Sequence, residues 1–399
     1  MRFAPGNPRR LVRGYVAGTI DVVMRLPPFV GALALLAVPA GLLGAGAPPT
    51  PHGTAWLVAD GATGEILAQH GIDTPHPMAS TTKMMTALVA MESGNLDRMV
   101  TVPPAAVSVG ESSAGLKVGE RIPLRQLLRG LLVGSGNDAA VAIAYGVAGS
   151  ESAFVDLMNE KAKAMGLTNT HFANPHGLDA AGHHASARDL LTMGEAVMQQ
   201  PFLRSIVARR TITLPGPNGP RTLTSENDLL SMFAPADGVK TGHTNHAGYV
   251  EVAHATDPGT GVGLFAVVMG DASRAQRAAD EKALLTWGFR RYAKPTVLTQ
   301  GTVVVHVPVE GAPGRDVALV PATDVSGVVR IGKPIRVRVT ALAQVAAPSA
   351  AGTHAGTVEV LQDNAVVARR PLVVATDVAS PGFFEQVRSA LEGIGSVFT

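Results

Sequence analysis

The sequence predicts an α/β domain in which strands from both ends form one antiparallel sheet beside a helical middle, followed by a small all-β domain and an amphipathic C-terminal helix. Two observations support this fold class. β-type runs lie on both sides of a helical stretch, and beyond residue 294 the sequence changes to alternating valines and short turns. The chain has 399 residues, 46% hydrophobic and 16% charged, which is enough to bury two cores. The expected boundaries are 51–294 for the α/β domain, 295–379 for the all-β domain and 380–399 for the terminal helix.

Residues 1–47 are expected to be a secretion leader, because a positively charged segment precedes an apolar run and the small residues Ala45-Gly46-Ala47. Pro39 interrupts the apolar run, and a membrane-spanning helix usually needs about 20 uninterrupted apolar residues. A cleaved signal peptide is therefore favoured over a permanent anchor. Met24 stands directly before the compact part of this signal, so we expect translation to begin there.

The charge balance argues against a nucleic-acid partner. The net charge is +2 at pH 7, whereas residues 1–47 hold five arginines and one aspartate, a local charge of +4. The remainder therefore carries +2 minus +4, or −2, and offers no basic face of the kind that neutralises phosphates. The absence of cysteine excludes thiol catalysis and thiolate metal sites.

The α/β domain is expected to begin with a hairpin, because two β-type runs, 54–60 and 65–69, flank a turn bracketed by glycines. A helix follows over 80–91, where apolar residues recur at helical spacing. The remaining expected elements, in chain order, are helical segments over 127–147 and 152–165, strands over 210–214, 248–253 and 263–269, and an amphipathic helix over 277–289.

The all-β domain is expected from short valine-rich runs separated by turn signals. These runs cover 302–308, 335–340, 356–361, 365–368 and 372–375. None of them carries a catalytic cluster, so the domain is interpreted as a spacer or a binding module.

The segment 380–399 begins with Ser380-Pro381, an N-cap followed by proline at the first helical position. Its apolar residues fall on one helical face, which is typical of a helix lying at a membrane surface. A helix packed on its own domain stays possible, because glycines weaken the end of this helix and cations are scarce. The apolar face consists of Phe383, Val387, Leu391, Ile394 and Phe398.

Ser80 and Lys83 are the first candidate catalytic pair. They are three residues apart on the expected helix, so they share one face. A serine needs an adjacent base to become a nucleophile, and a lysine can be that base only where burial or a second cation lowers its pKa. On its own this pair is weak evidence, because serine and lysine are common on helices.

Two further motifs make the pattern specific. The order and spacing of Ser80-Thr-Thr-Lys83, Ser135-Gly-Asn137 and Lys240-Thr-Gly242 match the signature of active-site serine penicillin-recognising enzymes. With them the chain resembles the low-molecular-mass penicillin-binding proteins, serine D-alanyl-D-alanine carboxypeptidases of the peptidase S11 type. This resemblance implies a β-lactamase/transpeptidase-like fold for the α/β domain and covers nearly everything after residue 54. It is also carried by the stretches 77–86, 132–139, 176–179, 186–189, 237–244, 284–289 and 368–374.

The resemblance implies a role for each motif residue. Ser80 would attack the carbonyl of the penultimate D-alanine after passing its proton to Lys83, which releases the terminal D-alanine and leaves an acyl-enzyme. Ser135 would relay a proton to the leaving amine, and Asn137 would hold a substrate amide. Lys240 would help to keep Lys83 neutral by its positive charge.

The same resemblance implies how the free carboxylate of the substrate is recognised. Thr241 would donate a hydrogen bond to it, and Arg277, which matches the carboxylate-reading arginine of the family, would bind it as a charged fork. Gly242 would leave room for the peptide along the strand edge. Backbone N–H groups of Ser80 and His243 would line the oxyanion hole. For Arg277, an exposed position at the start of a helix stays open as the alternative.

The group that activates the deacylating water is not identified by a motif. Class A β-lactamases use a loop glutamate for this step, but the corresponding segment offers only Glu160 and the run 174–179. Turn formation accounts for His176 and Asp179 at least as well as catalysis does, so neither is assigned. Lys83 is the default.

The preferred function is therefore trimming of peptidoglycan stem peptides in the periplasm, peripheral on the outer face of the inner membrane, with β-lactam antibiotics as covalent inhibitors. A β-lactamase is disfavoured by the missing loop glutamate, the all-β domain and the terminal helix. A low-turnover penicillin-binding scaffold is disfavoured by the intact motifs. The chain has 12 histidines but no metal-ligand motif among them, so no metal or cofactor is expected.

Overall fold

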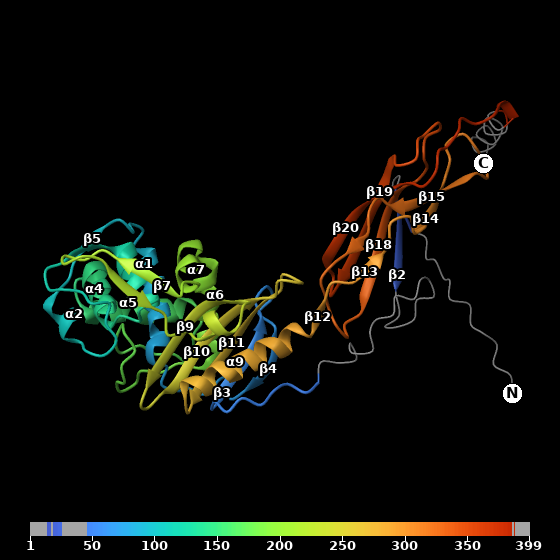
Figure 1. Cartoon of the computed structure of the whole chain (residues 1–399). Helices are drawn as coiled ribbons and strands as arrows, with labels where there is room; N and C mark the ends of the chain where they lie inside the picture. The colour runs from blue at the N-terminus through green and yellow to red at the C-terminus, as the bar shows by residue number, and fades with distance from the viewer. Residues whose placement is uncertain (1–13, 17–18, 26–45, 385–386, 388–399) are drawn as a thin grey trace, which may run out of the picture. The chain divides into compact units, whose positions relative to one another are not determined.

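The computed structural model describes residues 14–16, 19–25, 46–384 and 387. The contacts within the chain separate two compact units (Figure 1). We call residues 45–290 the α/β unit, and residues 1–44 together with 291–399 the β unit.

The α/β unit is built on a five-stranded sheet of order β4-β3-β11-β10-β9. All neighbouring strands are antiparallel. The order places β3, from the start of the unit, beside β11, from its end, and this confirms the predicted fold class. The strand β9 forms one edge. The strands are β3 (Ala55–Asp60), β4 (Ile66–His70), β9 (Ala236–Thr244), β10 (Gly248–Thr256) and β11 (Gly263–Asp271).

Helices cover both faces of this sheet (Figure 1). Gly288 of α9 lies against Leu264 of β11, whereas Gly194 of α6 lies near Phe265, whose side chain points to the opposite face. The helical elements are η2 (Ala79–Thr82), α1 (Lys83–Glu92), α2 (Pro104–Ser108), α3 (Leu124–Leu132), α4 (Asn137–Ala148), α5 (Glu151–Ala164), α6 (Ala187–Gln199), α7 (Pro201–Val207), α8 (Leu229–Met232) and α9 (Arg274–Phe289).

Three expected elements of this unit differ in detail. The helix expected from residue 80 begins as the 3₁₀ turn η2, and α1 starts only at Lys83. The helical segment expected over 127–147 is divided into α3 and α4, with Ser135 in the connection at a left-handed φ of 53°. The strand expected over 210–214 pairs outside the main sheet, in one of two small two-stranded sheets. These sheets are β5 (Met99–Thr101) with β6 (Arg121–Pro123), and β7 (Thr211–Leu214) with β8 (Arg221–Thr224).

The β unit holds a seven-stranded sheet of order β1-β2-β18-β19-β20-β15-β14 around a core rich in valine. The two runs expected over 365–368 and 372–375 form one strand, β20, and β15 was not expected. The strands of this part are β12 (Tyr292–Ala293), β13 (Thr296–Leu298), β14 (Val305–Pro308), β15 (Asp316–Pro321), β16 (Val325–Ser326), β17 (Val329–Arg330), β18 (Ile335–Leu342), β19 (His354–Gln362) and β20 (Ala365–Val374).

Part of the expected leader is paired in the β unit. The strands β1 (Gly14–Val16) and β2 (Thr19–Arg25) lie at one edge of the sheet, and β2 is antiparallel to β18. Without β2, the backbone N–H and C=O groups along one side of β18 would be unpaired. Such an open strand edge readily pairs with another strand. The leader interpretation did not foresee this pairing. Residues 26–45 lie outside the described residues, and cleavage of the leader stays a prediction.

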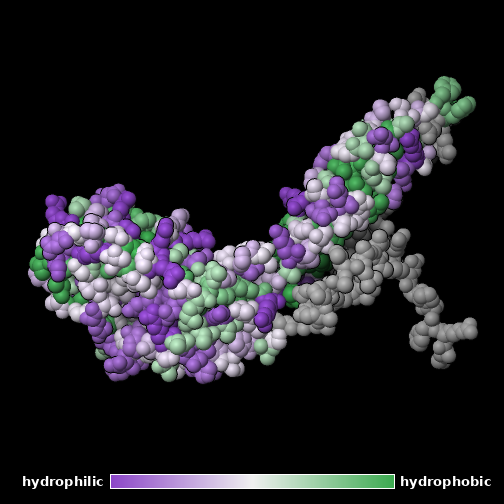
Figure 2. Space-filling model, viewed as in Figure 1, coloured by the Kyte–Doolittle hydropathy of each residue, from purple (hydrophilic) through white to green (hydrophobic). Residues whose placement is uncertain are grey.

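Most of the terminal helix expected over 380–399 also lies outside the described residues. Phe383 and Phe384 are described, and they expose 74% and 87% of their surface. Figure 2 shows hydrophobic atoms at this end of the β unit. Within the described ranges no single helix is long and apolar enough to span a membrane, while α4 and α5, bent by 86°, meet that criterion only as a pair.

Candidate active site

Lys83 lies at the centre of the candidate site. It is the first residue of α1, and its side chain is fully buried. Its Nζ lies 2.7 Å from Ser80 Oγ, 2.7 Å from Asn137 Oδ1 and 2.6 Å from the carbonyl oxygen of His176. The structure thus brings the first two motifs together at one amino group.

The surroundings of Lys83 favour its neutral form. Burial lowers the pKa of Lys83 well below its ordinary value, and the charge of Lys240 lowers it further. A neutral amine has two N–H donors and one lone pair. The carbonyl oxygens of Asn137 and His176 can accept both N–H groups, which leaves the lone pair for the Ser80 hydroxyl. In this arrangement Lys83 can accept the proton of Ser80.

Lys240 and Ser135 form the second polar contact of the site. Lys240 Nζ donates to Ser135 Oγ at 3.1 Å and to the carbonyl oxygen of Thr241 at 2.7 Å. Burial lowers the pKa of Lys240 to about 8. Lys240 and Ser135 are both buried, so a cation and a hydroxyl are held together beside the reacting groups.

The edge strand β9 passes very close to the nucleophile. A Cβ atom added at Gly242 would lie 2.8 Å from the backbone nitrogen of Ser80, so only glycine fits at this point. The next residue, His243, is exposed, and its ring lies 4.1 Å from the ring of Tyr249, centroid to centroid. The predicted third motif therefore lies alongside Ser80.

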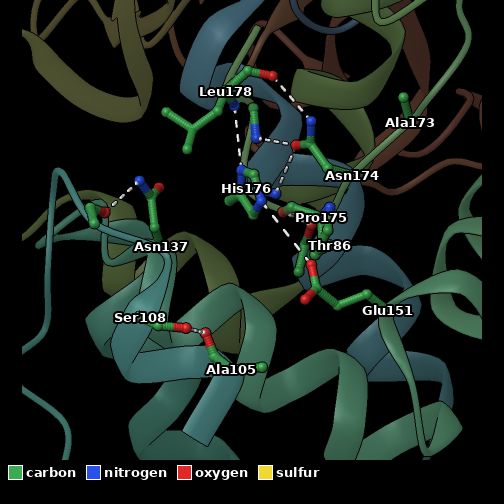
Figure 3. Close-up of polar contacts among 12 residues, drawn as sticks. Thr86, Ala105, Ser108, Asn137, Glu151, Ala173, Asn174, Pro175, His176 and Leu178 are labelled. Atoms are coloured by element: carbon green, nitrogen blue, oxygen red, sulfur yellow. Dashed lines mark hydrogen bonds and ion pairs between the residues drawn. The ribbon is translucent and has the colours of Figure 1, made fainter. Parts of the chain in front are cut away.

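The loop 174–178 supplies the His176 carbonyl oxygen that Lys83 contacts, and its own hydrogen bonds hold it (Figure 3). Asn174 Oδ1 accepts the N–H groups of His176 and Gly177 at 3.2 and 2.7 Å. The ring of His176 accepts the N–H of Leu178 through Nδ1, and its Nε2 lies 3.9 Å from Glu151 Oε2. Burial lowers the pKa of His176 to about 3, so its ring is neutral. This geometry agrees with the interpretation of the segment as a turn.

Asp138 also orders the site, although sequence reasoning missed it. Its carboxylate accepts hydrogen bonds from Ser113 Oγ at 2.6 Å and from the backbone of Ala114 at 2.7 Å. These bonds hold the loop whose Gly110 carbonyl oxygen accepts a hydrogen bond from Asn137 Nδ2 at 3.2 Å. An acidic residue directly after Ser-Gly-Asn, at the start of a helix, was the available signal.

Arg277 is buried, so the alternative of an exposed arginine at the helix start is wrong. Its Nε lies 2.9 Å from Glu251 Oε2, and Glu251 is the antiparallel partner of Thr241 in the pairing of β10 with β9. Sequence reasoning also missed Glu251. A single charge in the otherwise apolar run 248–253 was the signal.

Asp179, which sequence reasoning left without a catalytic role, is hydrogen-bonded to two residues. Asp179 accepts hydrogen bonds from Thr244 Oγ1 at 2.8 Å and His246 Nδ1 at 3.0 Å, and so joins its loop to the end of β9. Across the described part of the chain, no three histidine, aspartate or glutamate side chains are arranged to hold a metal ion.

Comparison with known proteins agrees with this geometry. A family model described as D-alanyl-D-alanine carboxypeptidase matches residues 44–273, and one described as the C-terminal domain of penicillin-binding protein 5 matches 292–380. D-alanyl-D-alanine carboxypeptidase DacA of Escherichia coli (strain K12) is 35% identical over 354 residues, which cover 85% of this chain and 87% of DacA. DacD of Salmonella typhimurium is 33% identical over 356 residues, with coverage of 85% and 90%.

Solved structures show the same relationship. The crystal structure of penicillin binding protein 5 from Haemophilus influenzae matches with a TM-score of 0.60 and 31% identity, covering 84% of this chain and 99% of that one. The family model alone spans more than half of the sequence. The chain therefore belongs to the D-alanyl-D-alanine carboxypeptidase family that its three motifs resemble.

Proposed function

We propose that this carboxypeptidase removes the terminal D-alanine from peptidoglycan pentapeptide stems through an acyl-enzyme on Ser80. The observation that carries the proposal is the contact of Ser80 Oγ with the buried amine of Lys83, 2.7 Å away. The two carbonyl oxygens beside Lys83 occupy its N–H donors, so its lone pair faces the hydroxyl that must lose a proton.

In the acylation step, Lys83 takes the proton of Ser80 while Oγ bonds to the carbonyl carbon of the penultimate D-alanine. The C–N bond to the terminal D-alanine then breaks, and its amine receives a proton through Ser135, which Lys240 contacts. The backbone N–H groups of Ser80 and His243 stabilise the oxyanion. The close passage of β9 at Gly242 supports this assignment.

Deacylation returns water to the same carbonyl carbon and releases a stem that ends in one D-alanine. We assign Lys83 as the base that activates this water. The ring of His176 contacts Leu178 and Glu151, and Asp179 is bonded to Thr244 and His246. Their contacts therefore support roles in shaping the loop. β-Lactams would acylate Ser80 by the same first step and leave slowly.

The proposal is tested by D-alanine release from diacetyl-L-Lys-D-Ala-D-Ala and by labelling with a fluorescent penicillin. The wild-type chain is expected to do both, and Ser80→Ala neither. Ser205→Ala, an exposed serine on α7, is the matched control and should behave as wild type. Labelling without D-alanine release would favour the penicillin-binding scaffold instead. Rapid release of penicilloate, followed by mass spectrometry, would favour the β-lactamase.

We further propose a periplasmic enzyme, exported by the leader and held on the outer face of the inner membrane by residues 380–399. The exposed Phe383 and Phe384 support this placement, since aromatic side chains favour the membrane interface. A chain that ends at residue 379 should leave the membrane fraction while keeping D-alanine release. Its retention there would contradict the proposed anchor.

A further inference from the structure

Two buried glutamates lie beside the arginine proposed to read the substrate carboxylate. Glu251 on β10 and Glu281 on α9 are both fully buried, and their carboxyl groups adjoin. Arg277, one turn before Glu281 on the same helix, forms an ion pair with Glu251 at 2.9 Å. The reaction steps above use neither glutamate. A buried charge is costly unless it is paired, so this arrangement requires an explanation.

The two carboxyl groups fit together only with a proton between them. Within the described part of the chain, no N–H group and no hydroxyl group donates a hydrogen bond to a carboxyl oxygen of Glu251 or Glu281. The charge of Arg277 acts on both carboxyl groups, and one guanidinium can balance only one carboxylate. Burial raises the pKa of Glu281 well above its ordinary value, and the adjoining Glu251 raises it further. Glu281 is therefore the protonated partner and can donate to Glu251.

The other acidic neighbour of Arg277 already has a partner. Asp228 accepts two hydrogen bonds from Arg274, at 2.5 and 2.7 Å, while its distance to Arg277 is 3.8 Å. Glu251 is thus the carboxylate that fixes the guanidinium of Arg277. It engages Nε, while Nη2 of Arg277 donates to the backbone carbonyl oxygen of Glu226 at 3.4 Å. The remaining N–H groups of the guanidinium can bind a second carboxylate.

The position of Glu251 links this pair to the substrate site. Glu251 is the antiparallel partner of Thr241, so their side chains lie on one face of the sheet. Thr241 follows Lys240, which contacts Ser135. A carboxylate bound at Thr241 would therefore lie within reach of an arginine that Glu251 orients.

We propose that Glu251 is a positioning residue, buried beside Glu281, that orients Arg277 toward the terminal carboxylate of the substrate beside Thr241. This inference rests on the proposed carboxypeptidase function of the Ser80 site. It assigns to the pair a role in selecting a free carboxylate, and no role in bond breaking.

The test compares kcat and KM for diacetyl-L-Lys-D-Ala-D-Ala with those for its C-terminal amide. Glu251→Gln keeps the size of the side chain but loses its charge, and we expect KM for the free acid to rise about tenfold while kcat changes less than about twofold. The preference for the acid over the amide should fall by the same factor. Glu251→Asp, which shortens the reach of the carboxylate, should shift KM in the same direction.

A double-mutant cycle separates positioning from a general effect on the fold. In an Arg277→Ala background, Glu251→Gln should change KM no further, because the residue through which Glu251 acts is gone. An equal effect in both backgrounds, or an unchanged KM in both Glu251 variants, would overturn the inference. Glu359→Gln, a buried strand glutamate in the β unit that also pairs with arginine, is the matched control and should keep wild-type KM.

The inference and the proposed function fail in different ways. A wild-type chain that releases no D-alanine contradicts the proposed function. A wild-type chain that releases D-alanine, with Glu251 variants that leave the acid-over-amide preference unchanged, contradicts only the role of Glu251.

Discussion

The two units of this chain treat charge in opposite ways. The described part of the α/β unit buries two lysines, Lys83 and Lys240, the arginine Arg277 and several carboxylates. Within the described part of the β unit, Glu359 is the one buried charged residue. Burying a charge costs free energy unless partners compensate for it. The contrast indicates that the α/β unit gives up stability for chemistry, whereas the β unit is built mainly for stability.

Removal of Lys83 is the strongest test of this contrast. Lys83→Met keeps the buried stem of the side chain but removes the base, so acylation by a fluorescent penicillin should slow by ~10³-fold. The fold should survive, because removal of the amine also removes the cost of burying it. Stopped-flow labelling together with a thermal melt measures both effects. Labelling at the wild-type rate would contradict the role of Lys83 as base.

Gly242 tests whether backbone proximity matters as much as charge. In Gly242→Ala the new Cβ would lie 2.8 Å from the Ser80 nitrogen, so β9 or η2 must shift. A displacement of this size should lower kcat/KM by ~10²-fold. Gly259→Ala is the matched control, since its Cβ would meet only Asp257 Oδ2 at 3.4 Å. Equal activity of the two variants would show that the close approach is unimportant.

The sequence predicted the motif residues better than the contacts that orient them. Ser80 and Lys83 could be paired from their spacing alone, because three residues form about one helical turn. The His176 carbonyl oxygen lies 93 residues from Lys83 and is aimed by a loop, and no local pattern encodes such a contact. Glu251 is a lone charge in an apolar run, which marks it as unusual. Its partners Arg277 and Glu281 lie on α9, which follows the next strand, β11, so local sequence does not reveal the contact.

The fold shows the same division. The predicted hairpin and the strands β10 and β11 of the main sheet followed from alternation and turn residues, which are local signals. The edge strand β9 (Ala236–Thr244) was not predicted. β20 was predicted as two runs because Arg369-Arg370-Pro371 interrupts its valines, and proline within a run argues against a continuous strand. The pairing of Pro371 with Thr357 keeps the strand continuous. The pairing of β20 with β19 therefore determines that this segment is one strand, which the local sequence pattern does not show.

The pH dependence should differ between activity and stability in the α/β unit. The pKa of Lys240 is about 8, below its ordinary value of 10.5, so above about 8 its positive charge is lost and kcat/KM should fall. The unfolded chain keeps this proton up to about 10.5, so between these values the contribution of Lys240 to stability rises with pH.

The variant Lys240→Arg isolates this titration. Arginine stays charged through this range, so the alkaline fall of kcat/KM near pH 8 should disappear, even where the maximal rate is lower. Profiles between about pH 6 and 10 measure this change. An unchanged alkaline limb in the variant would assign the titration to another group.

The smallest expected effect on catalysis comes from the buried charge of the β unit. Glu359 accepts hydrogen bonds from Arg338 and Arg369, each at 2.7 Å from Nε. The side chains of both arginines are themselves 44% and 66% exposed, so water can solvate them when Glu359 loses its charge. Glu359→Gln should therefore lower the free energy of unfolding by only about 1 kcal/mol and leave kcat/KM unchanged.

Chemical denaturation of Glu359→Gln, beside the exposed control Glu310→Gln, measures this difference. A loss of several kcal/mol would mean that Glu359 is held as tightly as the charges around Ser80, and the contrast between the units would fail. A change in kcat/KM would also contradict this contrast, because it would show that the charge of Glu359 in the β unit affects the reaction at Ser80. An unchanged rate with a small loss of stability is the outcome that a unit built for stability requires.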